Sequence, residues 1–595
     1  MEKMIKKSYG KKGTKIVDKN IAVMKKAIDA IEQIHYPESW ADADSGALHI
    51  LEEAPQYVQD VVYPMLALQG DHLPVSAFQP DGVVPTGTTR YEKRGVAVQV
   101  PIWLPEHCIQ CNHCSFVCPH AAIRPYLAKE AELEEAPEGF TTIKASGQIS
   151  EELRYRIQIS PLDCTGCGNC VDTCRASITA LEMKPLDEVV ETEDALFRFA
   201  ESLPEHDLEF SKNNVRESQF SRPLFEYSGA CPGCGETPYL KLLTQLFGNR
   251  MLIANATGCS SIYGGNAPTT PYCTDREGRG PAWASSLFED NAEYGYGYYL
   301  AVAQLRQQLT TLIEEALTLE LPAALRDTFT RWLEVKDEGK PSLEAADRVR
   351  ELLKTETVLT SGKVRTLLEE IDNRKDLLAK RSIWIIGGDG WAYDIGFGGL
   401  DHVLSTGADV NVLVLDTEVY SNTGGQSSKA TPTAAVAKFA AAGKQTSKKD
   451  LGMMMMSYGY VYVAQVAMGA SGQQLIRAFT EAEAYPGPSL IIAYSPCISH
   501  GINMGRSQRE EKLAVESGYW SLYRFNPLLA KEGKNPFILD SKEPRGDLLS
   551  FMMSETRFKT LQHQFPHKAE ELFKKAEEDA AERQALYRRL AGLKK

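Results

Sequence analysis

The chain has 595 residues, of which 43% are hydrophobic and 24% are charged, which is ordinary usage for globular proteins. This composition excludes collagen, coiled coil and wholesale disorder, and the length indicates roughly four domains. The net charge of −14, from 65 basic and 79 acidic side chains, argues against broad nucleic-acid binding, which requires a basic surface. The informative residues are the 13 cysteines, because they are clustered along the chain.

The first residues and the hydropathy of the sequence indicate in which cellular compartment we expect the chain. Residues 1–7 have positive charges but no apolar segment after them, so we expect no signal peptide. No stretch approaches the ~18 uninterrupted apolar residues of a membrane helix. We therefore expect a cytoplasmic chain without a membrane segment, in which thiols stay reduced. In that setting, closely spaced cysteines favour metal or cluster ligands over disulfides.

Shifts in composition divide the chain into segments. Residues 1–95 are predicted to be a partly helical lead-in, because apolar residues from Ile21 to Ile34 recur at helical spacing until Pro37. The remaining predicted segments are a cysteine-rich module (96–185), a polar and acidic linker (186–224), a large α/β domain (225–525) with a charged helical insertion at about 305–380, and a C-terminal extension (526–595) that ends in a charged surface helix.

Three short apolar runs predict the sheet of the α/β domain. They are rich in β-branched residues, are bounded by turn residues, and cover 382–386, 410–415 and 489–494. Such continuous apolar runs are typical of parallel strands that are buried on both faces.

The cysteine-rich module contains one motif twice, Cys-x2-Cys-x2-Cys-x3-Cys, at 108–118 and at 164–174. Three thiolates at this spacing bind one 4Fe–4S cluster, and the fourth reaches the other cluster. We therefore assign one cluster to Cys108, Cys111, Cys114 and Cys174, and the other to Cys164, Cys167, Cys170 and Cys118. Zinc is the alternative, but two zinc sites do not need the third and fourth cysteines at these offsets. Arg175 stands where the motif often has proline, which affects the turn but not the ligands.

A third set of cysteines lies in the α/β domain. Cys231 and Cys234 form a single CxxC pair, which is equally compatible with a redox dithiol or a zinc site. The distant Cys259 and Cys497 could complete four ligands, and spacing alone leaves this open. Cys273 is left over and is expected to be a free thiol.

Two of the predicted strands lead into polar, glycine-rich turns. Gly388, Asp389 and Gly390 follow the first strand, and the segment 416–425 follows the second. An acid, a hydroxyl and carbonyl oxygens at neighbouring strand ends suit Mg²⁺ carrying a diphosphate, and glycines let the backbone approach phosphates. The alternative is an ordinary tight turn after a buried strand.

The spacing from Gly388-Asp389-Gly390 to the second element, residues 416–422, resembles that of thiamine diphosphate enzymes. The second element departs from the generic Asn-Asn form and resembles the version in pyruvate:ferredoxin (flavodoxin) oxidoreductases. Further stretches resemble the same family in the same order, at 229–238, 256–261, 280–284, 287–293 and 495–497. The resemblance covers nearly the whole chain. It implies an α/β fold, with a parallel-sheet thiamine diphosphate-binding domain and a small α+β ferredoxin-like domain upstream.

The resemblance also implies roles for individual residues. It implies a third, proximal 4Fe–4S cluster on Cys231, Cys234, Cys259 and Cys497, and Mg²⁺ ligation by Asp389, Thr417 and the carbonyl of Val419. It implies catalytic roles for Glu236 and for Asn422, which would face the substrate; alternatively, Glu236 caps a helix and Asn422 is a turn residue. The implied thiamine diphosphate contacts are Glu236, Cys259, Gly388, Asp389, Gly390, Trp391, Thr417, Glu418, Val419, Tyr420, Ser421 and Asn422.

The implied reaction is oxidative decarboxylation of pyruvate with coenzyme A, with electrons passed through three clusters to ferredoxin or flavodoxin. In the family a long N-terminal half carries the pyrimidine-side domain, and nothing in residues 1–100 resembles it. We therefore expect a split subunit or fragment, a second polypeptide that supplies this half, and a homo-oligomeric whole enzyme. The rival interpretations are another 2-oxoacid:ferredoxin oxidoreductase and an iron–sulfur relay that has lost decarboxylation.

Overall fold

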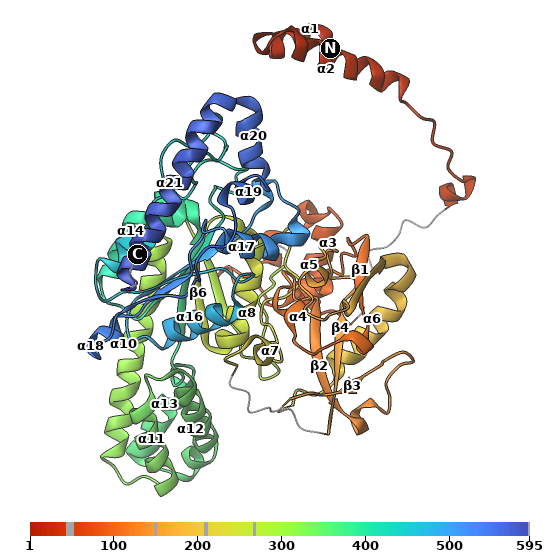
Figure 1. Ribbon diagram of the computed structural model, residues 1–595. Coiled ribbons are helices and arrows are strands. Elements are labelled where there is room, and N and C mark those ends of the chain that lie inside the picture. The colour runs from red at the N-terminus through yellow and green to blue at the C-terminus, as the bar shows by residue number, and fades with distance from the viewer. Residues whose placement is uncertain (43–52, 148–151, 207–211, 266–268, 593–595) are drawn as a thin grey trace. The chain divides into compact units, whose positions relative to one another are not determined.

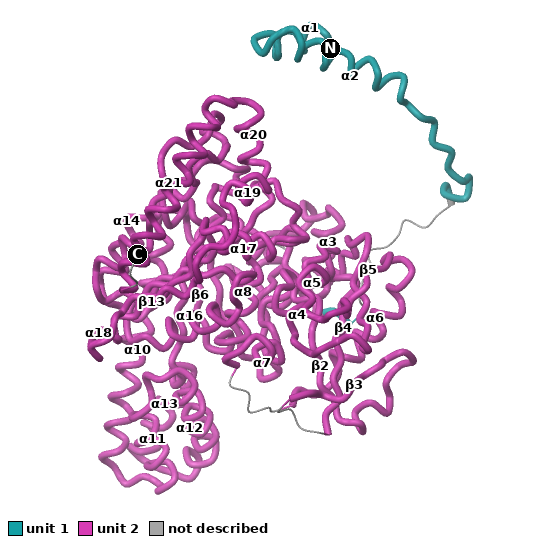
Figure 2. The backbone as a smooth tube through the Cα atoms, in the orientation of Figure 1, with its two compact units in different colours: residues 1–54 teal, residues 55–595 magenta. Residues whose placement is uncertain are grey.

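The computed structural model describes residues 1–42, 53–147, 152–206, 212–265 and 269–592. These residues form two compact units, 1–54 and 55–595, which Figure 2 shows in different colours. The first unit contains helices α1 (Glu2–Tyr9) and α2 (Thr14–Asp29). Helix α2 ends at Asp29, so the predicted helical spacing extends past the observed helix to Ile34. Among the described residues, no helix has both the length and the apolar character needed to cross a bilayer.

Residues 55–95 belong to the second unit, which corrects the prediction of a continuous lead-in over 1–95. This segment contains α3 (Tyr63–Leu66) and buries Val58, Val61 and Val62. Further along, Arg90 donates to the buried carboxylate of Glu226 at 2.7 Å, and Lys93 forms an ion pair with Asp163. These long-range contacts fix the segment to both following domains, a connection that local sequence patterns do not reveal.

The cysteine-rich module (96–185) has two small sheets and two short helices around a common core (Figure 1). Strands β2, β4 and β3 form an antiparallel sheet in that order, and β1 pairs with β5. Each short helix, α4 or α5, lies within one of the two cysteine motifs. The bounds are β1 Gln99–Trp103, α4 His113–Phe116, β2 Ile123–Lys129, β3 Ile143–Lys144, β4 Leu153–Ile159, α5 Asn169–Asp172 and β5 Leu181–Pro185.

The predicted linker, 186–224, is largely structured, which corrects that expectation. Helix α6 (Leu186–Ser202) packs against β4 and buries Leu196, Phe197 and Ala200 on one face. The acidic side chains on its other faces gave the segment its linker-like composition, although a helix needs only one apolar stripe to dock. A second short helix, α7 (Val215–Ser218), is capped by the side chain of Asn214.

The α/β domain is built on an eight-stranded sheet of order β13-β12-β10-β11-β9-β8-β6-β7 (Figure 1). The six strands from β10 to β7 are parallel, as predicted, whereas β12 and β13 are antiparallel. The bounds are β6 Met251–Ala256, β7 Ala282–Ser286, β8 Ser382–Gly388, β9 Asn411–Asp416, β10 Tyr462–Val466, β11 Ser489–Tyr494, β12 Tyr523–Phe525 and β13 Phe537–Leu539.

Helices cover both faces of this sheet, and alternate strand residues point to each. Ile383 and Ile385 of β8 join the core of one face, whereas Trp384 joins that of the other. Helices α8 (Thr237–Phe247) and α16 (Gly472–Ala484) lie in the Trp384 core. The other core receives α14 (Phe397–Ser405), α15 (Leu451–Met456), α17 (Ser507–Glu516), α19 (Leu548–Met552), α20 (Thr556–Gln564) and α21 (Pro566–Leu590). Two further short helices are α9 (Cys259–Gly265) and α18 (Pro527–Lys531).

The helical insertion begins earlier than the predicted start near 305. It comprises α10 (Asn291–Leu317), α11 (Ala323–Val335), α12 (Gly339–Leu359) and α13 (Gly362–Asp372), between β7 and β8. The first turns of α10 pack on the sheet, where Ala292 is buried, and the distal part forms a separate small core around Trp332.

The C-terminal segment 526–595 is likewise part of the domain, because β13 completes the sheet edge. Its last helix, α21, buries Leu572, Phe573 and Tyr587 against the domain and exposes its charged face, as the amphipathic pattern predicts.

Glu511 in α17 is a buried acid at the carboxyl edge of the sheet. Its carboxylate accepts hydrogen bonds from the Tyr239 hydroxyl (3.1 Å), the Gly469 amide (2.8 Å) and the Gln508 side chain (3.1 Å). Burial raises the pKa of Glu511 to about 8, and these donors oppose the rise only in part.

We predict that Glu511 makes the chain less stable as the pH rises. The raised pKa keeps the acid protonated in the folded state while the unfolded state ionises above the ordinary value of 4.5. Stability should therefore fall between pH 4.5 and about 8 and level off above it, by on the order of 1.4 kcal/mol per unit of pKa difference. Glu511→Gln should flatten this slope in urea midpoints measured from pH 5 to 9.

Glu516→Gln is the matched control, because Glu516 lies on the same helix but its side chain is half-exposed. It forms an ion pair at 3.7 Å with Lys512, whose side chain is also exposed. This variant should keep the wild-type slope. An unchanged slope in Glu511→Gln would contradict the account.

Candidate active site and cluster sites

The predicted site residues gather at the carboxyl edge of the parallel strands. Asp389 follows β8, Thr417 follows β9, Cys259 follows β6 and Cys497 lies three residues past β11. The strand order reverses between β6 and β8, because the chain goes outward from β6 to β7 and then returns to β8 on the other side. Ligands in open α/β sheets bind at such switch points.

The three predicted Mg²⁺ ligands converge on one hydroxyl. The Thr417 Oγ1 lies 3.0 Å from Asp389 Oδ1 and 3.0 Å from the carbonyl oxygen of Val419. The Ser428 hydroxyl, which sequence reasoning missed, donates to Asp389 Oδ2 at 2.6 Å. Asp389 is buried, and both this burial and the neighbouring Asp416 raise its pKa well above the usual value. A buried carboxylate among hydroxyl and carbonyl oxygens fits a hard cation such as Mg²⁺.

Asp416 and Glu418, in contrast, are neutralised by the protein itself. Lys448 Nζ lies 2.8 Å from Asp416 and 3.0 Å from Glu418, and Arg557 lies 2.7 Å from Glu418. Burial opposes ionisation of Glu418, but Lys448 and Arg557 outweigh it and lower its pKa to about 2. Lys448 and Arg557 carry no motif and were missed, because only tertiary packing brings them here.

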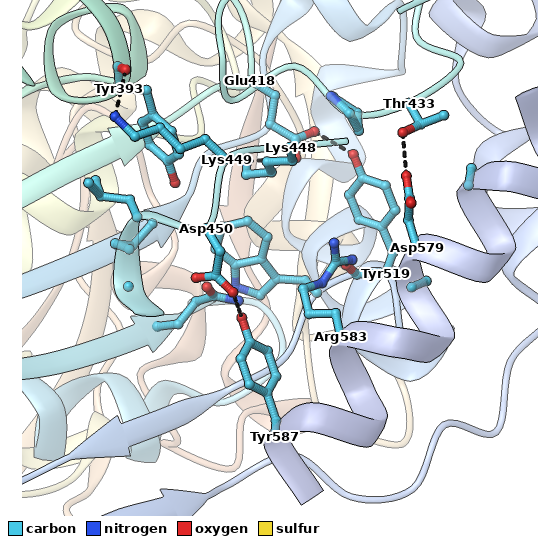
Figure 3. A pocket seen from close by; sticks show the side chains of 18 of the residues that line it. Tyr393, Glu418, Thr433, Lys448, Lys449, Asp450, Tyr519, Asp579, Arg583 and Tyr587 are labelled. Atoms are coloured by element: carbon cyan, nitrogen blue, oxygen red, sulfur yellow. Dashed lines mark hydrogen bonds and ion pairs between the residues drawn. The ribbon is translucent and has the colours of Figure 1, made fainter. Parts of the chain in front are cut away.

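Figure 3 shows the pocket behind this network, in which Glu418 points toward Tyr519. The Tyr519 hydroxyl donates to Glu418 at 2.6 Å, and the Glu418 amide donates to Asp416 at 3.1 Å. The carboxylate and amide of Glu418 are thus engaged within the protein. Its backbone has a positive φ of 61°, which non-glycine residues adopt only when their surroundings hold them. Glu418 therefore shapes the turn that presents Thr417 and Val419.

The glycine-rich turn after β8 packs closely against that turn. A Cβ on Gly390 would lie 2.6 Å from the Tyr420 ring, so only glycine fits there. Gly388 has open space instead, with no atom nearer than 3.9 Å to such a Cβ. Trp391 is fully buried, and its Nε1 has no hydrogen-bond partner among the described residues. The absence of a close neighbour at Gly388, beside Asp389, fits the prediction that the backbone here approaches a diphosphate.

Glu236 and Asn422 approach the same edge from different elements. Glu236 precedes α8 but makes no side-chain cap; instead it accepts the Tyr263 hydroxyl at 2.8 Å, and burial raises its pKa to about 7. The structure therefore does not support the alternative in which the Glu236 side chain caps α8. Asn422 lies in an exposed turn after Ser421, whose hydroxyl is 3.2 Å from Cys259 Sγ.

All three predicted cysteine quartets assemble in the structure. In each quartet, burial raises the pKa of at least one thiol, and the charges of neighbouring thiols in the same quartet raise it further. The quartets are Cys108, Cys111, Cys114 and Cys174; Cys118, Cys164, Cys167 and Cys170; and Cys231, Cys234, Cys259 and Cys497. The thirteenth cysteine, Cys273, is buried apart from them.

The spacing of these quartets bears on the zinc alternative. Every cysteine is a free thiol. Among the described residues, no group of three or more His, Cys, Asp or Glu side chains is arranged around a single ion. Four sulfurs around one zinc would lie within about 4 Å of one another, since Zn–S bonds are about 2.3 Å. The assignment of 4Fe–4S clusters to the module quartets therefore rests on the repeated motif, with its third and fourth cysteines at fixed offsets.

Backbone contacts join the module's second quartet to the quartet of the α/β domain. Burial raises the pKa of Cys167 to about 11, and the Gly233 amide, from the loop between Cys231 and Cys234, donates to its sulfur and opposes that rise. A Cβ on Gly505 would lie 2.3 Å from the Cys167 carbonyl oxygen. Gly233 has a φ of 74° and abuts the Met504 carbonyl in the same way. Glycine thus permits direct backbone contact between the two quartets.

The sheet, the carboxyl-edge acids and the cysteine quartets together are those of a protein class that binds thiamine diphosphate and iron–sulfur clusters. Family models agree. Residues 375–493 match the thiamine pyrophosphate enzyme C-terminal TPP binding domain, residues 107–178 match a 4Fe-4S dicluster domain, and residues 45–97 match EKR, a domain of unknown function.

The chain is 62% identical to the pyruvate:ferredoxin oxidoreductase of Moorella thermoacetica over 99% of this chain and 50% of the relative. It is 52% identical to the pyruvate-flavodoxin oxidoreductase of Klebsiella pneumoniae over 100% of this chain and 50% of that one. It is 46% identical to a mitochondrial NADP-dependent pyruvate dehydrogenase of Euglena gracilis, over 98% of this chain and 32% of that one.

The chain belongs to the family of pyruvate:ferredoxin and pyruvate-flavodoxin oxidoreductases, and it spans about half the length of these two relatives. A solved 2-oxoglutarate:ferredoxin oxidoreductase from Magnetococcus marinus matches with a TM-score of 0.27 and 14% identity, over 46% of this chain and 65% of that one. That likeness is too weak to support an argument.

We predict that Gly505→Ala separates the two quartets locally. The added methyl group would collide with the Cys167 carbonyl oxygen, which is backbone and cannot rotate away. Hydrogen exchange at the Gly233 amide should rise at least tenfold, about 1.4 kcal/mol of lost protection. Gly398→Ala is the control, because nothing lies within 4 Å of a Cβ there. Unchanged exchange at Gly233 would show that the contact does not depend on Gly505.

Proposed function

We propose that this chain provides the thiamine diphosphate-binding and electron-transfer half of a pyruvate:ferredoxin (flavodoxin) oxidoreductase. In the whole enzyme, pyruvate and coenzyme A would give acetyl-CoA, CO2, a proton and two electrons, which leave singly to ferredoxin or flavodoxin. The observation that carries the proposal is continuity. The Ser421 hydroxyl at the carboxyl edge lies 3.2 Å from Cys259 Sγ, the Gly233 amide donates to Cys167, and the charge of Cys114 in one module quartet raises the pKa of Cys170 in the other.

Asp389, Thr417 and the carbonyl of Val419 would hold Mg²⁺, and the backbone at Gly388 would approach the diphosphate. Thiamine diphosphate supplies an electron sink for the carbanion left by decarboxylation. The protein's part is to position the reacting groups and to exclude water. The exposed Asn422 would meet the substrate's carbonyl or carboxylate. Glu236 stays partly protonated near neutral pH because it is buried, so it can hold or give up a proton beside the site.

The three quartets would each hold a 4Fe–4S cluster. Such clusters accept one electron at a time, which suits the stepwise removal of two electrons. Ser421 belongs to the turn that carries the proposed cofactor contacts, and its hydroxyl lies 3.2 Å from Cys259 Sγ. The quartet that contains Cys259 would therefore take electrons first. The contact of Gly233 with Cys167 would pass them into the cysteine-rich module.

The proposal also covers the half of the relatives that this chain does not span, and the partners of the whole enzyme. The chain spans about half of the Moorella and Klebsiella relatives, so we propose that turnover requires a second polypeptide or segment with the pyrimidine-side domain. We also propose that the whole enzyme is a homo-oligomer. A chain that alone reduces ferredoxin with pyruvate and coenzyme A would refute the first point, and sedimentation of the reconstituted enzyme tests the second.

Two rivals make different predictions. Another 2-oxoacid as substrate would appear when pyruvate, 2-oxobutyrate and 2-oxoglutarate are compared after reconstitution. An electron relay without decarboxylation would not bind thiamine diphosphate, yet the convergence of Asp389, Thr417 and Val419 supports a retained cation site.

The decisive experiment is calorimetric titration of the reconstituted protein with thiamine diphosphate and Mg²⁺. Asp389→Asn keeps the shape of the side chain but removes the charge that faces the cation. We expect it to weaken binding by at least about 100-fold, or roughly 2.7 kcal/mol. Binding to Asp389→Asn at wild-type affinity, or no binding to the unaltered protein, would contradict the proposal.

Asp401→Asn is the matched control for this titration. Asp401 lies in α14 of the same domain, and its carboxylate accepts the Tyr458 hydroxyl at 2.8 Å. Its binding should equal that of the unaltered protein, whereas an equal loss in both variants would point to a general folding defect.

A further inference from the structure

Lys241 is a lysine buried deep between the α/β domain and the cysteine-rich module. It lies in the middle of α8 and is only 1% exposed. Its ammonium donates to the carbonyl oxygens of Ser115 and Phe116, the latter at 3.0 Å. Both carbonyls lie between Cys114, which belongs to one proposed cluster, and Cys118, which belongs to the other.

This ammonium has no carboxylate partner among the residues that the structure describes. Several other buried or nearly buried cations do have one. Arg124 pairs with Glu226 at 2.6 Å, Lys448 with Asp416 at 2.8 Å, and Arg557 with Glu418 at 2.7 Å. Buried charges in proteins are normally paired in this way, because desolvation of an isolated charge is costly. Among the described residues, Lys241 departs from this pattern, as does Arg156, whose guanidinium donates to Gln158 and to the Thr141 carbonyl.

The groups that face Lys241 indicate what balances its charge. Burial lowers its pKa to about 8, Cys118 and Cys114 raise it, and Arg124 lowers it further. The anions nearby are therefore the thiolates of two different quartets. A 4Fe–4S cluster with four thiolate ligands is anionic and gains one more negative charge on reduction.

We propose that Lys241 is the counter-charge shared by the two clusters of the cysteine-rich module, and that it raises their reduction potentials. The inference rests on the proposed cluster assignment. A buried positive charge stabilises the reduced, more negative cluster over the oxidised one, because Coulomb interactions are weakly screened in the interior. The α/β domain would thereby make the module a better acceptor for electrons that arrive from it.

The simpler alternative is that Lys241 only binds the last carbonyls of α4. A glutamine amide could donate to a carbonyl there without the cost of burying a charge. Three donors on one ammonium exceed the two acceptors that the described residues provide, which leaves one N–H directed elsewhere. A purely structural role would leave the cluster potentials unchanged, so the potentials distinguish the two.

The test is a redox titration of the cluster-loaded protein, followed by electron paramagnetic resonance. In Lys241→Met, which keeps the length of the side chain, at least one module cluster should become tenfold harder to reduce, a shift of 59 mV to lower potential. Lys241→Arg, which keeps the charge, should shift by less than half as much. The cluster on Cys231, Cys234, Cys259 and Cys497 should keep its potential in every variant.

Lys184→Met is the matched control, since Lys184 lies on β5 of the same module with a 42% exposed side chain. Its removal should leave all potentials unchanged, because solvent screens an exposed charge. The proposal would be overturned if the reduction equilibrium of the module clusters in Lys241→Met stayed within threefold of that in the unaltered protein. It would also be overturned if Lys241→Arg shifted their potentials as much as Lys241→Met does.

Iron and sulfide contents are measured on every variant, so that a loading failure is also decisive. Loss of the module clusters in both Lys241→Met and Lys241→Gln, with retention in Lys241→Arg, would support the proposal, because the clusters then require the charge. Loss in all three would overturn it in favour of a packing role. An unaltered protein without the iron expected for the module clusters would instead refute the proposed function itself.

Discussion

The site depends on the placement of two buried carboxylates, Asp389 and Asp416, at the ends of adjacent parallel strands. They repel each other, and burial disfavours both charges. Lys448 stabilises the charge of one of them, because its ammonium lies 2.8 Å from Asp416. Among the described residues, Asp389 has hydroxyl partners alone, from Thr417 and Ser428. The protein thus supplies a cation for Asp416 but places none against Asp389, which is the arrangement that the proposed Mg²⁺ site requires.

The cysteine pattern of the module and the strand-end acids could be predicted because their information is local. Steps of three or four residues within each motif indicate which thiols can share a cluster, and a strand followed by a polar turn indicates which side chains reach the sheet edge. Cys259 and Cys497, in contrast, lie too far along the chain from Cys231 for spacing to group them. Lys448, Arg557 and Ser428 could not be found in this way, since each meets its partner only after the sheet has formed. The helix α6 was mistaken for a linker for a related reason. Its three buried apolar residues, Leu196, Phe197 and Ala200, are few beside its acidic ones, and it is the packing against β4 and β5 that makes them a core face.

The cysteine-rich module is held to the α/β domain by buried polar contacts rather than by a tether. Asn169 in the second cysteine motif donates to Ser507 at 2.9 Å, the Tyr227 amide donates to the carbonyl of His120 at 2.9 Å, and Arg124 pairs with Glu226 at 2.6 Å. Breaking any of these would leave a buried polar group without a partner, at a cost of about 1–3 kcal/mol each. The segment 55–95 adds Arg90 to the same Glu226 carboxylate. The module and the domain therefore share buried polar contacts around this acid.

The packing of the module on the domain bears on the proposed electron transfer. A module on a flexible linker would pass electrons only when diffusion brought it close, whereas here packing sets the separation of the quartets. The glycines at 233 and 505 have no side chain to hold the two backbones apart, and their neighbours Met504 and Cys167 occupy the space where a Cβ would be. Glycine at both positions thus lets backbone contact backbone at this junction. Since the junction lies next to Cys231 and Cys167, the constraint that shapes the fold there would also set the distance that an electron crosses in the proposed transfer.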